Sequence, residues 1–172
     1  MIRPCLIQFG HGFFMTFTIR KTTSDDIRAV IGLGREFAKF EKLDQYFVIT
    51  EEKLADAMFG TDSFVEGLVA EADQRIIAYA IFYPNFASFR GQKGFFLEDL
   101  YIDADYRGQG VGEAILKEVA RIARSRNFDR IDFQVLDWNL PAIKFYEKHG
   151  ADRSDDERHY VFNDEAFQLL AK

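Results

Sequence analysis

Apolar residues recur every second position in some segments of the chain, as in strands, and every three or four positions in others, as in helices. Phe17–Arg20 alternates apolar and polar side chains, as a short strand does. Apolar residues then recur at helical spacing over residues 27–38, behind a Thr/Ser/Asp cluster typical of a helix start. Thr50 is predicted to cap a second helix, Glu51–Phe59, which the next residue, a glycine, would end.

The middle of the chain has the pattern of strands. Phe64–Glu71 and Arg75–Tyr83 are strand-like runs joined by a short Ala-Asp-Gln turn, which predicts a hairpin. Pro84–Gly94 is predicted to be a loop that contains aromatic residues. Phe95–Ile102 is predicted to be a buried strand, and the Gly-rich stretch Tyr106–Gly112 follows it.

The last third of the chain returns to alternating elements. Glu113–Arg124 has one apolar stripe and predicts an amphipathic helix. Arg130–Leu136 predicts a strand, Pro141–His149 a short helix that Gly150 ends, and Tyr160–Phe162 a final strand. Because helices interleave with strands, we expect an α/β (α+β) fold with a mixed central sheet and helices on both faces.

Length and composition indicate one globular domain. The chain has 172 residues, 48% of them hydrophobic, which is too apolar for a disordered protein. No repeat or linker divides it. Met15 precedes a strand-like segment and is a candidate start, so we expect residues 1–14 to be an unstructured extension and residues 15–172 to form the domain.

Charge and cysteine content exclude several classes of function. The net charge is −6, with dispersed basic residues, which argues against nucleic-acid binding. No apolar run is long enough to span a membrane, and the first residues make a poor signal peptide. The single cysteine, Cys5, cannot form an intramolecular disulfide, which fits a cytoplasmic protein. His11, His149 and His159 have no partners at metal-ligand spacing, so we expect no metal.

The strongest local motif is the Gly-rich turn between a strand and a helix. Glycine allows positive φ and close approach of the backbone to a ligand, and a helix start offers unpaired N–H donors with partial positive charge. The motif therefore predicts an anion site suited to a pyrophosphate, with an arginine as added charge. A Gly-rich turn without a ligand is the alternative. The residues are Arg107, Gly108, Gln109, Gly110, Val111 and Gly112.

The segment RGQGVG matches neither a P-loop nor a dinucleotide-binding fingerprint, because it lacks a Gly-Lys-Ser/Thr ending and the G-x-G-x-x-G spacing. It resembles instead the R/Q-x-x-G-x-G/A signature of the GNAT acetyltransferases. The chain is most similar to the spermidine/spermine (diamine) and thialysine acetyltransferases of that superfamily, from Phe17 to about Phe162. The similar stretches are IRKTTSDD, EFAKFEKL, FFLEDLYIDADYRGQGVGEAILK, WNLPAIKFYEKHGA and DDERHYVF.

The resemblance implies an acetyl-CoA-dependent N-acetyltransferase with a mostly antiparallel sheet, and usually a homodimer. Asn139 would help to bind CoA, and Tyr146 would point its hydroxyl at the thioester sulfur as the general acid. A helix cap is the alternative for Asn139, and a core aromatic for Tyr146. The expected CoA-binding residues are Leu100, Tyr101 and Ile102 of the buried strand, Arg107, Gly108, Gln109, Gly110, Val111 and Gly112 of the turn, and Asn139 and Tyr146.

Amine acetylation needs a base, because an ammonium has no lone pair, and an acid helps the thiolate to leave. The resemblance implies that Glu98 is the general base, acting through water, and that Asp99 attracts the cationic substrate. Adjacent strand residues point to opposite faces, so Glu98 and Asp99 can share a pocket only if the strand is bulged. The alternative is that one carboxylate pairs with an arginine and stabilises the sheet.

The resemblance places three acids around a small cationic amine: Glu41, Asp99 and Glu157. Solvated surface acids are the alternative for the first and last. The closing strand reads Arg158-His159-Tyr160 where the family often has Trp, and the loop Asn85–Gly94 does not align well. A polyamine, a diamine, thialysine or another small amine therefore stays open. The other readings are a GNAT enzyme for an amino acid, antibiotic or peptide N-terminus, and a non-catalytic CoA-binding sensor.

Overall fold

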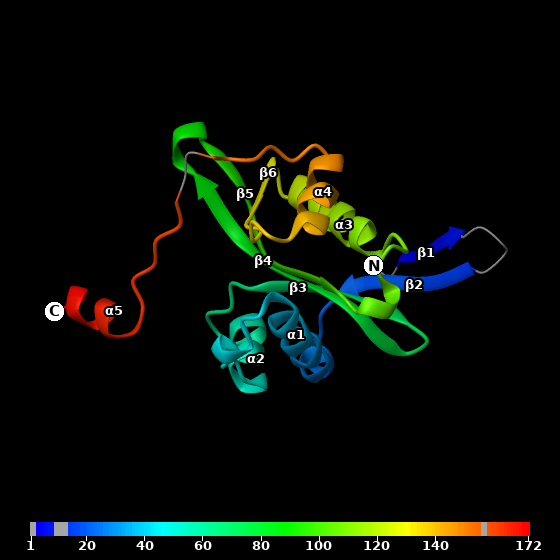
Figure 1. The fold of residues 1–172 in the computed structure, drawn as a ribbon, viewed down its shortest axis with the longest axis horizontal. Helices are drawn as coiled ribbons and strands as arrows, with labels where there is room; N and C mark the ends of the chain where they lie inside the picture. The colour runs from blue at the N-terminus through cyan, green and yellow to red at the C-terminus, as the bar shows by residue number, and fades with distance from the viewer. Residues whose placement is uncertain (1–2, 9–13, 156–157) are drawn as a thin grey trace. The chain divides into compact units, whose positions relative to one another are not determined.

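A six-stranded sheet is the frame of the larger part of the molecule. The computed structural model describes residues 3–8, 14–155 and 158–172, and the chain divides into two compact units, Met1–Gln134 and Val135–Lys172. In the first unit the strands lie in chain order (Figure 1), antiparallel except for the last, parallel pair, which confirms the predicted mixed sheet. The strands are β1 (Arg3–Gln8), β2 (Phe14–Lys21), β3 (Glu66–Ala72), β4 (Arg75–Ala87), β5 (Gln92–Ile102) and β6 (Arg130–Phe133).

Helices cover both faces of this sheet, as predicted (Figure 1). Helices α1 (Ile27–Glu41) and α2 (Glu51–Phe59) lie on one face, around a buried cluster that includes Tyr79 and Tyr101. Helix α3 (Val111–Ser125) lies on the other face. The second unit contains α4 (Leu140–Lys148) and α5 (Asp164–Leu170).

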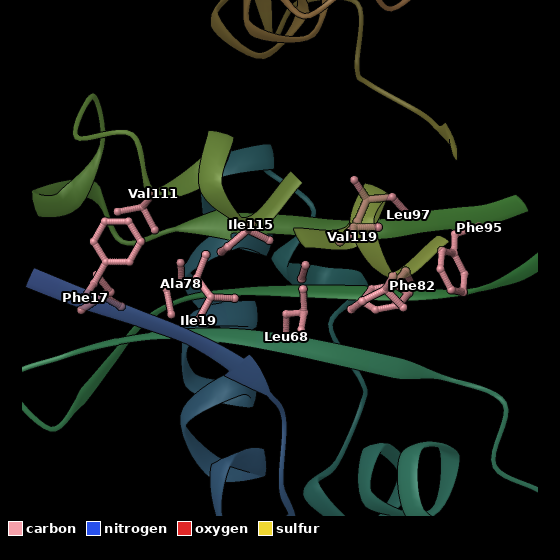
Figure 2. Close-up of a cluster of buried hydrophobic side chains, with 14 of the residues drawn as sticks. Phe17, Ile19, Leu68, Ala78, Phe82, Phe95, Leu97, Val111, Ile115 and Val119 are labelled. Atoms are coloured by element: carbon pink, nitrogen blue, oxygen red, sulfur yellow. The ribbon is translucent and has the colours of Figure 1, made fainter. Parts of the chain in front are cut away.

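The core beneath α3 shows why the amphipathic pattern forms a helix here. Val111, Ile115 and Val119 recur every four residues, so they form one stripe, and each is at most 1% exposed. Figure 2 shows this stripe against apolar side chains of four strands. The strand residues labelled there are Phe17, Ile19, Leu68, Ala78, Phe82, Phe95 and Leu97.

A partly buried ion network fixes the start of α1. Asp26 accepts hydrogen bonds from the Arg20 guanidinium at 2.6 and 2.8 Å and from the Thr23 N–H at 2.8 Å. Burial would raise the pKa of Asp26, but the hydrogen bonds from Arg20 and Thr23 lower it below its ordinary value. Arg20 also donates to Glu71 of β3 at 2.9 Å, so the helix is tied to two strands.

Local signals placed several elements correctly. Thr50 caps α2 by accepting a hydrogen bond from the Lys53 N–H at 3.3 Å, as predicted. The predicted hairpin is β3–β4, whose turn holds Asp73 and Gln74 at φ values of 47° and 61°. Positive φ at both turn residues matches the twist of the flanking strands.

The predicted loop Pro84–Gly94 is wrong. β4 continues to Ala87, β5 begins at Gln92, and only a short 3-10 turn with Gly91 (φ 62°) connects them. Pro84 is tolerated in this strand because β3 pairs with β4 only as far as Phe82. Beyond that point no strand pairs with this side of β4, so its backbone N–H groups are not needed for sheet hydrogen bonds. Proline, which lacks an N–H, is acceptable at such an edge.

The ends of the chain also differ from the expectation. Arg3–Gln8, expected to be unstructured, forms β1 and pairs antiparallel with β2; residues 1–2 and 9–13 lie outside the described part. The predicted strand Tyr160–Phe162 is wrong, because these residues have no regular structure and their side chains are exposed. α5 was not predicted.

Candidate active site

A β-bulge in β5 lies at the predicted acid pair. Ile81 of β4 opposes Asp99, and the next residue of β4, Phe82, opposes Leu97. Glu98 is therefore the extra residue, with no partner on β4. A bulge changes the direction in which side chains point, so the regular alternation that would separate Glu98 from Asp99 is broken here.

The hydrogen bonds of the two acids place both on one face of the sheet. Tyr79 donates to Asp99 Oδ2 at 3.1 Å, and Tyr83 donates to Glu98 Oε2 at 3.0 Å. Tyr79 and Tyr83 are four residues apart on β4, so they share a face, the one that α1 covers. The bulge thus brings both carboxylates to the α1 side, as a shared pocket requires.

The surroundings of Asp99, a half-buried residue, disfavour the charged form of its carboxyl. Burial raises the pKa of Asp99 to about 6; the hydrogen bond from Tyr79 lowers it, while Glu98 and Glu41 raise it further. A cation placed beside Asp99 would reverse this effect. The site is therefore suited to a positively charged ligand.

Glu41, the last residue of α1, adds a second acid to the same place. Its side chain is half-buried, and burial raises the pKa of its carboxyl above the ordinary value. Its charge acts on both Asp99 and Tyr79. Within the described residues, Glu41, Glu98 and Asp99 form no ion pair with a cationic side chain, so the alternative of an arginine partner does not hold there.

The Gly-rich turn has the predicted conformation. Gly108 and Gly110 have φ values of 72° and 74°, in the left-handed region that favours glycine. Gly110 precedes α3 and provides no side-chain cap, which leaves the first N–H groups of the helix without a side-chain acceptor. A Cβ built on Gly108 would meet nothing within 4 Å, so the turn has open space beside it.

Arg107, expected to add charge to an anion site, makes contacts within the protein. Its Nε donates to the Ile102 carbonyl at 2.9 Å, and its guanidinium lies over the rings of Phe40 and Tyr101 at 4.8 and 5.1 Å. Gln109 likewise donates to the Asp105 carbonyl at 2.8 Å. These side chains hold the shape of the turn, and its backbone is left to face a ligand.

The end of β5 has one open edge. β6 pairs with β5 only over residues 94–97, so Leu100, Tyr101 and Ile102 have β4 on one side and no strand on the other among the described residues. Such an edge can hydrogen-bond an extended ligand as an added strand would. The edge leads directly toward the Gly-rich turn.

The remaining candidates lie in the second unit. Asn139 is buried and caps α4 by accepting a hydrogen bond from the Ala142 N–H at 3.3 Å, so the cap role is present. Tyr146 lies on α4 beside Phe145, with ring centres 5.0 Å apart, and burial raises its pKa to about 12. Its hydroxyl is therefore protonated near neutral pH and can donate. Glu157 lies outside the described residues.

Two tyrosines of the site, Tyr79 and Tyr83, were not singled out from the sequence. The available signal was weak: two tyrosines four apart on the strand before the acid pair share a face. In the described part of the chain, no cluster of His, Cys, Asp or Glu could hold a metal, and no helix is long and apolar enough to cross a membrane.

Comparison with known proteins identifies the family. The model of the Acetyltransferase (GNAT) family matches residues 35–151, more than half of the chain. Thialysine N-epsilon-acetyltransferase of Bos taurus is 34% identical over 141 residues, covering 77% of this chain and 82% of the relative. The chain belongs to the GNAT acetyltransferase family. It is therefore an acetyltransferase, and this family uses acetyl-CoA as the acetyl donor.

A further curated relative and two solved structures extend the comparison. L-ornithine N5-acetyltransferase of Arabidopsis thaliana is 26% identical over 208 residues, covering 95% of this chain and 90% of the relative. An integron cassette protein of Vibrio cholerae superposes with a TM-score of 0.75 at 24% identity, covering 91% of this chain and 98% of that protein. An aminoglycoside acetyltransferase from a soil metagenome superposes with a TM-score of 0.71 at 15% identity, covering 87% of this chain and 97% of that protein. These structures share the GNAT fold.

The open space beside Gly108 yields a matched pair of variants. Gly91 also has a left-handed φ (62°) and also has nothing within 4 Å of a built Cβ. Gly108→Ala and Gly91→Ala should each lower the free energy of unfolding by about 1 kcal/mol, measured in urea. Only Gly108→Ala should weaken CoA binding in calorimetry, by about tenfold, because its Cβ would stand where the turn is predicted to receive the pyrophosphate. Equal affinity in the two variants would contradict this account of the turn.

Proposed function

We propose that this GNAT enzyme transfers acetyl to a primary amine of a small cationic substrate of the polyamine, diamine or thialysine type. The observation that carries the proposal is the bulge at Glu98, which brings two carboxylates to one face near a third, Glu41. The thialysine and L-ornithine acetyltransferases among its relatives support the same substrate class. Steering by such charges weakens with salt.

In the proposed reaction, the amine attacks the thioester directly in a ternary complex. Glu98 takes the proton of the substrate ammonium through a water, which frees the nitrogen lone pair. The C–N bond forms at the acetyl carbonyl carbon and the C–S bond breaks. Tyr146 donates its hydroxyl proton to the departing CoA sulfur; its pKa of about 12 means that it is protonated near neutral pH but a weak acid. Water takes up the second proton of the nitrogen as the amide forms and returns one to the Tyr146 oxygen. Asp99, Glu41 and Glu157 would hold the rest of the cationic substrate.

The acetyl-CoA site is assigned to backbone more than to side chains. The N–H groups of Gly108–Gly112 would hold the pyrophosphate, and the open edge at Leu100–Ile102 would bind the pantetheine arm. A donor at that edge can also polarise the acetyl carbonyl. Asn139 would assist CoA binding while it caps α4. A cytoplasmic location, where acetyl-CoA and reduced cysteine occur together, fits this chemistry.

The test is release of the CoA thiol from acetyl-CoA in the presence of spermidine, spermine, putrescine, thialysine, lysine or an N-terminal peptide. We expect release with a polyamine, a diamine or thialysine. Glu98→Gln and Tyr146→Phe should each lower kcat by about a hundredfold or more, the usual size of general acid–base effects. Glu52→Gln, on the exposed face of α2, is the control and should leave kcat unchanged.

The same assay separates the alternatives. Release with only lysine or the peptide would keep the chemistry and reject the proposed substrate class. Acetyl-CoA binding without release by any amine would favour a CoA-binding sensor and contradict the proposed function.

We also propose a homodimer, supported by the apolar C-terminal segment. Phe167, Leu169 and Leu170 of α5 are 53, 60 and 66% exposed, and exposed apolar groups of this kind mark interfaces. The same segment of a second copy is the proposed occupant, because a twofold interface pairs identical surfaces. Light scattering should give about twice 19.9 kDa for the natural chain. A Phe167→Glu, Leu170→Glu double variant should give the single mass; a monomeric natural chain would reject the dimer.

A further inference from the structure

We propose that Tyr79 is a positioning residue that determines the preference of this enzyme for cationic amines, acting through Asp99. The inference rests on the proposed function, in which Asp99 attracts the substrate. It assigns to Tyr79 a role without substrate contact: its hydroxyl holds the carboxylate in place and in its charged form.

The position of the Tyr79 hydroxyl is fixed from several sides. The side chain is 2% exposed, and its ring lies 6.4 Å from that of Tyr101. Helix α1 passes close to it at Gly34, where a Cβ would lie 3.4 Å from the Tyr79 oxygen and 3.1 Å from the Phe47 ring. A hydroxyl held in this way has a fixed direction, and its 3.1 Å hydrogen bond orients the Asp99 carboxylate.

The chemistry of the donor matters as much as its place. An arginine or lysine in this position would orient Asp99 but would also neutralise it. A tyrosine hydroxyl donates a hydrogen bond and leaves the negative charge available to an external cation. Burial and the charge of Asp99 raise the pKa of Tyr79 well above its ordinary value, so the hydroxyl stays a donor.

The groups around Asp99 come from three elements. Glu98 acts from β5 and Glu41 from α1, and both disfavour the Asp99 charge; Tyr79 acts from β4 and favours it. Tyr101 and Arg107 reach Asp99 only indirectly, since Tyr101 acts on Tyr79 and Arg107 on Tyr101. Removing the Tyr79 hydroxyl should therefore raise the pKa of Asp99.

The test compares two amines of equal length that differ by one charge, cadaverine and pentylamine. The kcat/KM ratio of the two, followed from about pH 5 to 9, cancels ionisations that both reactions share. In the natural enzyme we expect the ratio to rise through about pH 6, where Asp99 becomes charged. In Tyr79→Phe this rise should move up by about one pH unit, which corresponds to a roughly fivefold lower ratio near pH 6.

The variant Asp99→Asn provides the control for action through Asp99. It should lower the ratio at every pH above about 6, and adding Tyr79→Phe to it should cause no further change. A Tyr79→Phe enzyme that loses activity equally toward both amines at all pH values would overturn the proposal. An additional loss of preference in the double variant would overturn it as well.

A separate readout distinguishes failure of this proposal from failure of the proposed function. If the natural enzyme shows no preference between the two amines, the substrate assignment fails. The role of Tyr79 is then decided by the NMR titration of the Asp99 carboxyl in the natural chain and in Tyr79→Phe, without any amine. A midpoint that rises in the variant supports the positioning role, and an unchanged midpoint overturns it.

Discussion

The proposed amine site depends on the single extra residue that Glu98 inserts into β5. In a regular strand Glu98 and Asp99 would face opposite sides of the sheet, one toward α1 and the other toward α3. The bulge turns both toward α1, where Tyr83 and Tyr79 donate to them. The same strand continues past its last pairing with β6 to the Gly-rich turn, so one strand connects the acids with the proposed acetyl-CoA site.

Collecting acids without counter-cations has an energetic consequence. Because the pKa of Asp99 is raised to about 6 in the folded chain, the folded state binds a proton more tightly than the unfolded state does. Its stability contribution is therefore lost as the pH rises from about 4 through about 6, and the charged form destabilises the fold above that range. A cationic substrate would offset this cost. Asp26 differs, because its partner Arg20 lowers its pKa, so its charged form stabilises the fold.

Much of this structure could be predicted from local sequence signals. Hydrophobic periodicity predicted α1 and α3, the cap and stop residues Thr50 and Gly60 predicted α2, and the left-handed glycines of the turn followed from its composition. The pairing of strands was harder to predict from the sequence. β4 runs through Pro84 because its neighbour β3 has already ended, which no local signal shows. The Tyr79–Asp99 contact depends on the register between β4 and β5, which no local pattern specifies. Likewise the sequence predicts Arg107 to contribute charge to an anion site, and only tertiary contacts show its place over Phe40 and Tyr101.

The most direct test of the account is a crystal structure of the enzyme with CoA and cadaverine. The account predicts an amine nitrogen at hydrogen-bond distance from Asp99, about 2.7–3.2 Å, on the α1 side of the sheet. It also predicts the pyrophosphate on the N–H groups of the Gly-rich turn. An amine bound away from this face, with Glu98 and Asp99 contacting only Tyr83 and Tyr79, would contradict it.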